Sequence, residues 1–202
     1  MPSTFDMWMR ILHKVDGSIL WLFEDNLTAS AYLKLEAENR GVDSNRLIFA
    51  KRMELDEHLA RHKLADLFLD TFPYNAHTTA SDALWAGLPV LTLIGESFAS
   101  RVAASLLTAL NLKELITYSQ KEYESLAVEL ATNPQKLRVI KEKLEINRKT
   151  SSLFNGAVFA KNIENAYLQI YERYQAGLAP DHIEVKSQAN ELQMTDFENK
   201  WS

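Results

Sequence analysis

The 202-residue chain contains no cysteine, which excludes disulfide bonds, cysteine-ligated metals and thiol nucleophiles. It has only 6 glycines and 5 prolines, and no glycine-rich phosphate loop of the GxGxxG or P-loop kind occurs. No apolar run approaches the ~20 residues that a membrane-spanning helix needs. The N-terminal residues also lack the apolar core of a signal peptide. We therefore expect a cytoplasmic protein with no contact to a membrane.

A surplus of positive charge is also missing. The formal net charge of -5 gives no electrostatic basis for a nucleic-acid partner, which normally requires a basic surface. What the chain does have is the composition of a soluble globular domain, with 47% hydrophobic and 24% charged residues. Its length suits one domain of ordinary size or one half of a two-lobed protein.

Short apolar runs alternate with helical patterns along the first part of the chain. The runs are apolar throughout, which is typical of parallel strands covered by helices on both faces of a sheet. The fold class is therefore α/β with a parallel sheet, whose ligands bind at the carboxyl ends of the strands. The predicted strands are Ser18–Phe23, Arg46–Ala50, Leu67–Asp70 and Val90–Leu93, with a short last strand within Glu114–Tyr118.

Helical spacing of apolar residues predicts the remaining elements. Thr28 is a predicted N-cap and Gly41 a predicted helix stop. The segment after Val185 is polar and weakly periodic, and we expect it to be mobile or to form an accessory helix. The first predicted helix begins at Ser3 and Thr4. The other predicted helices are Thr28–Gly41, Leu55–Ala65, Thr78–Gly87, Ser97–Leu110, Gln120–Thr132, Pro134–Lys149 and Ala157–Ala176.

One segment combines several polar side chains where a strand turns into a helix. His77, Thr78 and Thr79 fall at the predicted helix start, and Asp82 follows three residues after Thr79. Unpaired N–H groups and a positive dipole make such a start suitable for a phosphate, and a carboxylate nearby can accept bonds from a sugar diol. The residues alone favour a simpler interpretation, in which Thr78 and Asp82 cap the helix.

A second candidate is the helix that contains His58, Arg61 and His62. A histidine pair at positions i and i+4 can bind zinc, but the sequence between them is HLARH and lacks the glutamate of an HExxH site. A solvated helix face or a ligand contact is therefore favoured over a metal site. In a third segment, Glu96 and Arg101 are interpreted as a local ion pair with a structural role.

The run LADLFLDTFPYNAHTTASDALWAGLPVLTLIGESFASRVAASLL resembles the catalytic region of the O-linked N-acetylglucosamine transferase family, in the style of its bacterial members. The resemblance extends from Pro2 to about Val185. It implies a Rossmann-like sheet with helices on both faces, namely the C-terminal, nucleotide-sugar-binding lobe of a GT-B glycosyltransferase that follows tetratricopeptide repeats. On this basis residues 1–185 are expected to form the donor-binding lobe and residues 186–202 a polar tail.

The resemblance also assigns roles to matching residues. It places Thr78 and Thr79 beside the donor diphosphate and Asp82 beside the ribose, with His77 in the same contact set. His58 is expected against the uracil and Arg61 three residues further on, near the donor. The family works without a metal or other cofactor, and we expect none here.

This sequence departs from the family at several points. Animal members have a lysine near the base where Leu55 stands, and leucine cannot donate a hydrogen bond. The family's FN….K element, whose lysine faces the donor phosphates, would precede Pro2, as would the first strand of the lobe, the other lobe and the repeats. We expect a donor-binding part that is inactive alone, with an open apolar surface that favours homodimerisation or strand addition.

The resulting expectation is the UDP-N-acetylglucosamine-binding part of a transferase that modifies Ser and Thr of proteins. The family's plant-type fucosyltransferases have glycine where His77 stands, so His77 favours this donor over GDP-fucose, while UDP-glucose stays open. No residue of the chain is a convincing general base. Two alternatives remain: a non-catalytic module for nucleotide sensing or protein interaction, and a generic phosphate-binding α/β protein.

Overall fold

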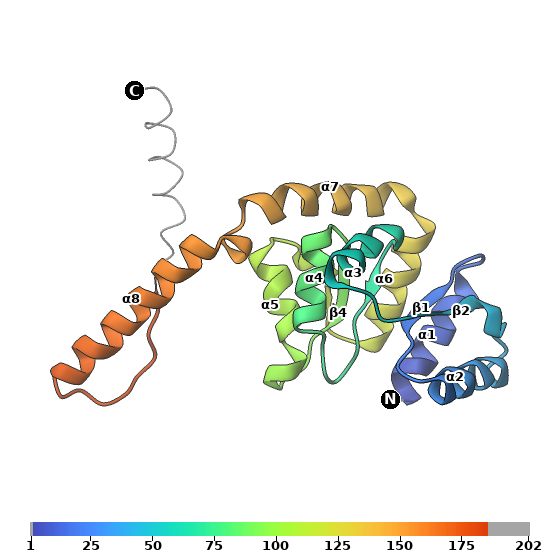
Figure 1. Cartoon of the computed structure of the whole chain (residues 1–202), viewed down its shortest axis with the longest axis horizontal. Coiled ribbons are helices and arrows are strands. Elements are labelled where there is room, and N and C mark those ends of the chain that lie inside the picture. The colour runs from blue at the N-terminus through green and yellow to red at the C-terminus, as the bar shows by residue number, and fades with distance from the viewer. Residues whose placement is uncertain (1, 186–202) are drawn as a thin grey trace, which may run out of the picture. The chain divides into compact units, whose positions relative to one another are not determined.

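The computed structural model describes residues 2–185, which form two compact units: the first ends at Arg148 and the second begins at Lys149. In the first unit, short strands alternate with helices (Figure 1). The strands are β1 (Leu20–Phe23), β2 (Leu47–Ala50), β3 (Phe68–Leu69), β4 (Val90–Leu93) and β5 (Ile116–Thr117). The helices are α1 (Pro2–Lys14), α2 (Leu27–Asn39), α3 (Leu55–Arg61), α4 (Thr78–Ala86), α5 (Val102–Ala109), α6 (Gln120–Thr132) and α7 (Pro134–Thr150), which ends two residues past the boundary of the unit.

All strand pairs are parallel, which confirms the predicted α/β class. The strands form two sheets: β1 pairs with β2, and β4 lies between β3 and β5. Within residues 2–185, the edge of β1 that faces away from β2 has no partner strand, and neither has the edge of β3 that faces away from β4. The described residues therefore form two separate parallel sheets where one sheet was predicted.

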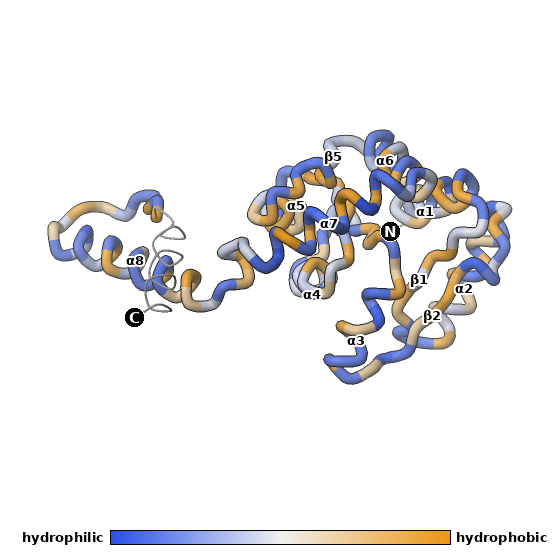
Figure 2. Tube along the Cα trace, turned by 90° about the horizontal axis from the view of Figure 1, so that it is seen from above, coloured by the Kyte–Doolittle hydropathy of each residue, from blue (hydrophilic) through white to orange (hydrophobic). Residues whose placement is uncertain are grey.

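Helix α1 connects the two sheets through two apolar stripes. Phe5, Met9 and Leu12 pack with Leu20 and Leu47 of the first sheet. On the other side of the helix, Met7, Ile11 and Val15 pack with Leu91 and Leu93 of β4 and with Tyr123 of α6. Helix α1 also lies beside α6 (Figure 2). Side chains three and four positions apart share a helix face, so alternate residues of α1 supply the two cores.

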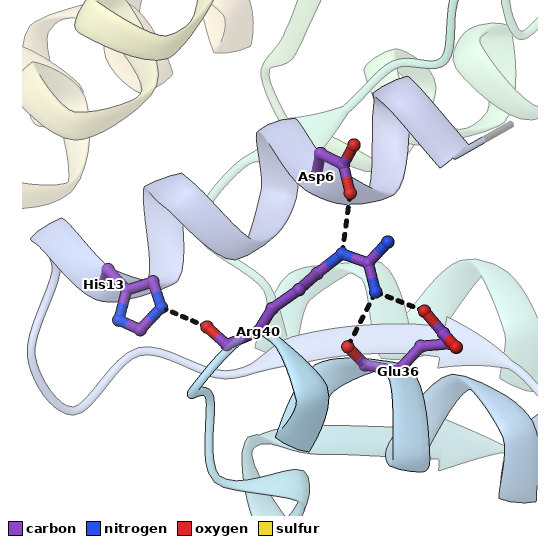
Figure 3. Close-up of polar contacts among 4 residues, drawn as sticks. All are labelled: Asp6, His13, Glu36 and Arg40. Atoms are coloured by element: carbon purple, nitrogen blue, oxygen red, sulfur yellow. Dashed lines mark hydrogen bonds and ion pairs between the residues drawn. The ribbon is translucent and has the colours of Figure 1, made fainter.

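An exposed ion network links α1 to the end of α2 (Figure 3). The guanidinium of Arg40 donates to Asp6 Oδ1 over 2.6 Å and also pairs with Glu36, while the Arg40 carbonyl oxygen lies 2.8 Å from His13 Nε2. Hydrogen bonds to Glu36 and Asp6 raise the pKa of Arg40. Because the network faces solvent, it orients the two helices but stabilises them little.

The two sheets differ in how well their faces are covered. All four residues of β4 are buried. In the β1–β2 sheet, the register places Trp21 opposite Ile48 on one face, and Phe23 follows on that same face. These three side chains are exposed, and Phe23 retains 54% of its accessible surface. The apolar colouring of these strands in Figure 2 is thus partly surface rather than core.

Three predicted helix ends are wrong. Asn26, not Thr28, caps α2, because its side-chain oxygen accepts from Ala29 N over 2.7 Å. The helix predicted from Leu55 to Ala65 becomes a 3-10 turn at His62. The predicted helix Ser97–Leu110 is a 3-10 turn over Phe98–Ser100 followed by α5. By contrast, α4 ends at Gly87 as predicted, and the structure shows this glycine in the left-handed conformation.

The second unit contains a 3-10 turn at Ser152–Phe154 and helix α8 (Gly156–Gln175), capped by Asn155. An exposed apolar stripe follows the helical repeat and consists of Phe159, Ile163, Tyr167, Ile170 and Tyr174. No helix within residues 2–185 is long and apolar enough to cross a membrane. The predicted tail, residues 186–202, lies outside the described residues, and the predicted division after Val185 remains a prediction.

Candidate functional site

The candidate site lies in the loop that connects β3 to α4. The loop starts at Asp70, which is buried directly after the strand, with 1% of its surface exposed. Its Oδ1 accepts hydrogen bonds from Thr71 N over 2.8 Å and from Ala76 N over 2.7 Å, and its Oδ2 accepts from Thr92 Oγ1 over 2.6 Å. One carboxylate therefore holds both ends of the loop and ties them to β4.

A buried asparagine completes the inner side of the loop. Asn75 donates from Nδ2 to Thr71 O over 2.9 Å and to Leu93 O over 3.3 Å. Its backbone N donates to Ala99 O over 2.9 Å, which joins this loop to the one that follows β4. Among the described residues, its buried Oδ1 has no hydrogen-bond partner. A buried acceptor without a donor is uncommon and often marks a ligand or water position.

Helix α4 begins with an open N-terminus. His77 is the N-cap residue, and its side chain makes no capping hydrogen bond. The interpretation of Thr78 and Asp82 as a simple cap is therefore wrong: Thr78 is the first helical residue, and Asp82 lies in the body of the helix. The first N–H groups carry a positive dipole end, and the hydroxyls of Thr78 and Thr79 lie in the same turn.

The imidazole of His77 contacts two aromatic rings. The ring of Tyr74 stacks on it, with centroids 5.0 Å apart, and the ring of Phe98 meets it edge-on at 6.0 Å. His77 Nε2 is buried and has no hydrogen-bond partner within residues 2–185. Both Tyr74 and Phe98 are exposed. The two rings contact the imidazole, and one of its nitrogens is left without a hydrogen-bond partner among the described residues.

Helix α3 brings two further predicted residues toward α4. Burial lowers the pKa of His58, and the positive charges of Arg61 and His62 lower it further, while the charge of Asp82 acts in the opposite direction. The pair of His58 and Asp82 thus lies within electrostatic range across the two helices. Arg61 turns its Nη1 toward Lys51 O, 2.9 Å away, so it supports the loop between β2 and α3.

Other predicted pairings do not form. His62 lies edge-on to His58 at 4.7 Å and uses Nδ1 to contact the His58 carbonyl oxygen. Residues 2–185 contain no group of three or more His, Asp or Glu side chains that could hold a metal ion. Glu96 and Arg101 do not form the predicted ion pair, since Arg101 Nη1 donates to Gly95 O. Two shallow hollows, of about 290 and 450 Å³, are lined by residues of β5, α6, α7 and the turns beside these elements, and by none of the site residues.

The start of α4 therefore offers unpaired N–H groups and threonine hydroxyls, which suit an anion, beside the aromatic rings of Tyr74 and Phe98. Sequence reasoning located His58, Arg61, His77, Thr78, Thr79 and Asp82. It missed the roles of Asp70, Tyr74, Asn75 and Phe98. The available signal was an aspartate at the end of a buried strand, because a charged group there is costly unless it has several hydrogen-bond partners.

Comparisons with known proteins identify the family. The model of glycosyl transferase family 41 matches residues 1–163. The UDP-N-acetylglucosamine--peptide N-acetylglucosaminyltransferase of Caenorhabditis elegans is 40% identical over 182 residues, which is 90% of this chain and 16% of that protein. A probable enzyme of the same name, SEC of Arabidopsis thaliana, is 37% identical over 185 residues, 91% of this chain and 19% of that protein.

A solved structure also matches. A point mutant of the O-GlcNAc transferase of Thermobaculum terrenum superposes with a TM-score of 0.80 and 32% identity, covering 84% of this chain and 33% of that one. This similarity confirms the predicted fold, that of part of a GT-B enzyme. The chain spans less than a fifth of the length of the two curated relatives described above.

Proposed function

The chain belongs to glycosyl transferase family 41, and from this premise we propose that it is the donor-binding part of a protein O-glycosyltransferase. In the proposed reaction, N-acetylglucosamine moves from UDP-N-acetylglucosamine to a Ser or Thr hydroxyl of an acceptor protein. The observation that carries the proposal is the open N-terminus of α4, with the unpartnered His77 Nε2 beside it. An uncapped helix start is a ready site for a diphosphate.

Each site residue then has a chemical role. The N–H groups of the first turn of α4, with Thr78 and Thr79, stabilise the negative charge that develops on the leaving diphosphate. Asp82 accepts hydrogen bonds from the ribose hydroxyls. His58 stacks against the uracil, and its lowered pKa keeps it neutral, which suits contact with an uncharged base. Arg61 holds the loop that approaches the base. No metal ion is required in this scheme.

The rest of the catalytic machinery is proposed to come from outside these residues. The unpaired edges of β1 and β3 fit one additional parallel strand between the two sheets, in the order of a Rossmann-like fold. We assign that strand, a phosphate-facing lysine, the other catalytic lobe and tetratricopeptide repeats to a larger, bacterial-type protein of the cytoplasm. The acceptor protein would contact mainly those parts.

Calorimetry with four ligands tests the donor assignment: UDP, UDP-N-acetylglucosamine, UDP-glucose and GDP-fucose. UDP-N-acetylglucosamine should bind more tightly than GDP-fucose, and the reverse order would sink the assignment. The variant His77→Ala with Asp82→Ala should lose most of its UDP affinity. A matched control is Asp16→Ala with His182→Ala, which removes the same two residue types at exposed positions and should bind UDP normally.

A second candidate function is nucleotide sensing or protein interaction without catalysis. Leu55, which is exposed at the start of α3, favours it because a leucine cannot bind a nucleotide base by hydrogen bonds. Transfer of labelled N-acetylglucosamine by the full-length protein separates the two functions. UDP binding without any transfer, in the presence of the other lobe and an acceptor mixture, would support the sensing module.

A further inference from the structure

We propose that Asp70 is a positioning residue, whose buried carboxylate holds the loop of residues 71–77 in the shape that presents His77 and the N-terminus of α4 to the donor. This inference rests on the proposed function, since it concerns the same site. Asp70 does not touch the donor in this scheme. It acts through the loop that it braces.

The brace is built from two amide contacts to one oxygen. Asp70 Oδ1 accepts from Thr71 N at the start of the loop and from Ala76 N at its end, next to His77. Charge-assisted hydrogen bonds are about twice as strong as neutral ones. If these contacts weaken, the backbone before His77 becomes free to move, and the helix start loses its fixed position.

The carboxylate itself is fixed from two other elements. The hydroxyl of Thr92 in β4 donates a hydrogen bond to Asp70 Oδ2. The ionised carboxylate has no proton, so it acts only as an acceptor in this contact. Tyr123 of α6 donates its hydroxyl to the Asp70 carbonyl oxygen over 2.9 Å. The titratable groups that face Asp70 are therefore His77, at the start of α4, and Tyr123. The contacts from β4 and α6 therefore keep Asp70 buried.

A purely structural role does not explain an ionisable group here. Burial raises the pKa of Asp70 to about 6, so its ionisation at neutral pH works against the fold. Asparagine has the same shape: its oxygen can face the two loop amides, and its amide can donate to Thr92. The difference between Asp70 and asparagine is the negative charge, and that charge strengthens both bonds to the loop.

A competing electrostatic effect makes the test decisive. A buried negative charge near a diphosphate repels it, so removal of the charge favours binding if repulsion dominates. Removal disfavours binding if the loop geometry dominates. Affinity for UDP-N-acetylglucosamine distinguishes the two, because its diphosphate is esterified at both ends and does not titrate near neutral pH.

The experiment compares the chain with its Asp70→Asn variant. We expect the variant to bind UDP-N-acetylglucosamine roughly tenfold more weakly at pH 7.5, with an equal or higher melting temperature. As pH falls from 7.5 to 5.5, the affinity of the unmodified chain should approach that of the variant. The variant leaves His58 and His77 unchanged, so the two proteins differ only at the Asp70 side chain. Asp66→Asn, at an exposed position, is the matched control and should change nothing.

Amide hydrogen exchange provides a readout that needs no ligand. The amide of Ala76 should exchange roughly tenfold faster in Asp70→Asn than in the unmodified chain. Unchanged exchange at Ala76, or equal or tighter donor binding by the variant, would overturn the inference. If the unmodified chain binds no donor at all, the proposed function fails, while the exchange rates still decide whether Asp70 braces the loop. Should Asp70→Asn fail to fold, Thr92→Val removes one contact to the same carboxylate and should give a smaller change in the same direction.

Discussion

The region around β4 and the region around β1 and β2 are built from the same parallel unit, yet they differ in what covers them. β4 is buried along its whole length between helices and neighbouring strands. The β1–β2 sheet is covered by α1 and α2 on one face and exposes Trp21, Phe23 and Ile48 on the other. The candidate site is attached to the fully covered region, where the loops are held by buried polar groups.

The two regions are ordered by different kinds of polar contact. Asp70, Thr92 and Tyr123 form a buried network, in which every bond acts in a low dielectric and is hard to replace by water. The polar contacts of the other region, such as the pair of Arg40 and Asp6, face solvent and are easily exchanged for water. Precise positioning of a ligand is therefore possible at the end of β3, and adaptable contact with another surface suits the β1–β2 sheet.

We expect the largest loss of stability from a substitution at the centre of the covered region. Leu91 is fully buried in β4, so Leu91→Ala removes packing against α1 and α6 on one face of the sheet and should lower the free energy of unfolding by about 2–5 kcal/mol. Ile48→Ala is the counterpart on the exposed face and should cost clearly less. Urea denaturation measures both. Equal losses at the two positions would show that the two regions are equally covered.

The stability of the covered region should depend on pH through Asp70. The pKa of Asp70 is raised from 3.8 to about 6 in the folded chain, so its stabilising contribution is complete below pH 3.8 and is lost as pH rises through about 6. Relative to Asp70→Asn, the unmodified chain should lose up to about 3 kcal/mol over this range. Denaturation curves at several pH values measure the difference. A constant difference between the two proteins from pH 4 to pH 7 would contradict it.

A single hydroxyl tests the buried network. Tyr123→Phe removes the donor to the Asp70 carbonyl oxygen and should cost about 1–2 kcal/mol, because that oxygen loses its side-chain partner inside the core. Tyr118→Phe is the matched control at an exposed position. Thermal denaturation of the two variants should separate them. If both variants melt like the unmodified chain, the hydroxyl of Tyr123 contributes nothing to the network.

The two helix starts should respond in opposite ways. Asn26→Ala removes the side-chain cap of α2 and should cost about 1 kcal/mol of stability without changing UDP affinity. His77→Ala removes no cap from α4 and should weaken UDP binding with little loss of stability. Calorimetry and thermal denaturation on both variants measure the contrast. A clear loss of stability in His77→Ala alone would assign that residue a structural role.

The smallest effect on stability is expected at the exposed face. Ile19→Ser with Phe23→Ser should change the free energy of unfolding by less than about 1 kcal/mol, since both side chains already face solvent. The same variant should reduce self-association, which the open apolar surface favours. Sedimentation equilibrium measures the association. A dimer that persists unchanged would mean that another surface joins the two copies.

The sequence allowed the parallel strands and the bounds of α4 to be predicted, because apolar runs and the stop at Gly87 are local signals. It did not allow the network around Asp70 to be predicted. Thr92 and Tyr123 reach Asp70 from 22 and 53 positions away, and no local pattern reports such pairings. The break before α5 was also missed. A Cβ atom at Gly95 would lie only 2.5 Å from Ser100 Oγ, so the chain turns back tightly between these two residues. The spacing of apolar residues in the sequence does not report this contact.

The candidate site likewise contains residues whose positions the sequence predicted and residues whose positions depend on tertiary packing. His77, Thr78 and Thr79 are neighbours in sequence, and their place at a helix start followed from the apolar run before them. The approach of His58 to Asp82 depends on the packing of α3 against α4 and was expected only from the family resemblance. Their assignment to the donor remains a prediction until ligand binding is measured.

The two stripes of α1 have a consequence for the order in which the chain folds during synthesis. Phe5, Met9 and Leu12 find their partners within the first fifty residues, so α1 can settle on β1 and β2 early. Met7 and Ile11 must wait for Leu91 and for Tyr123, which is made more than a hundred residues later. At about 5–20 residues per second, this apolar stripe stays open on the ribosome for on the order of ten seconds. That interval is a natural time for a chaperone to bind the nascent chain.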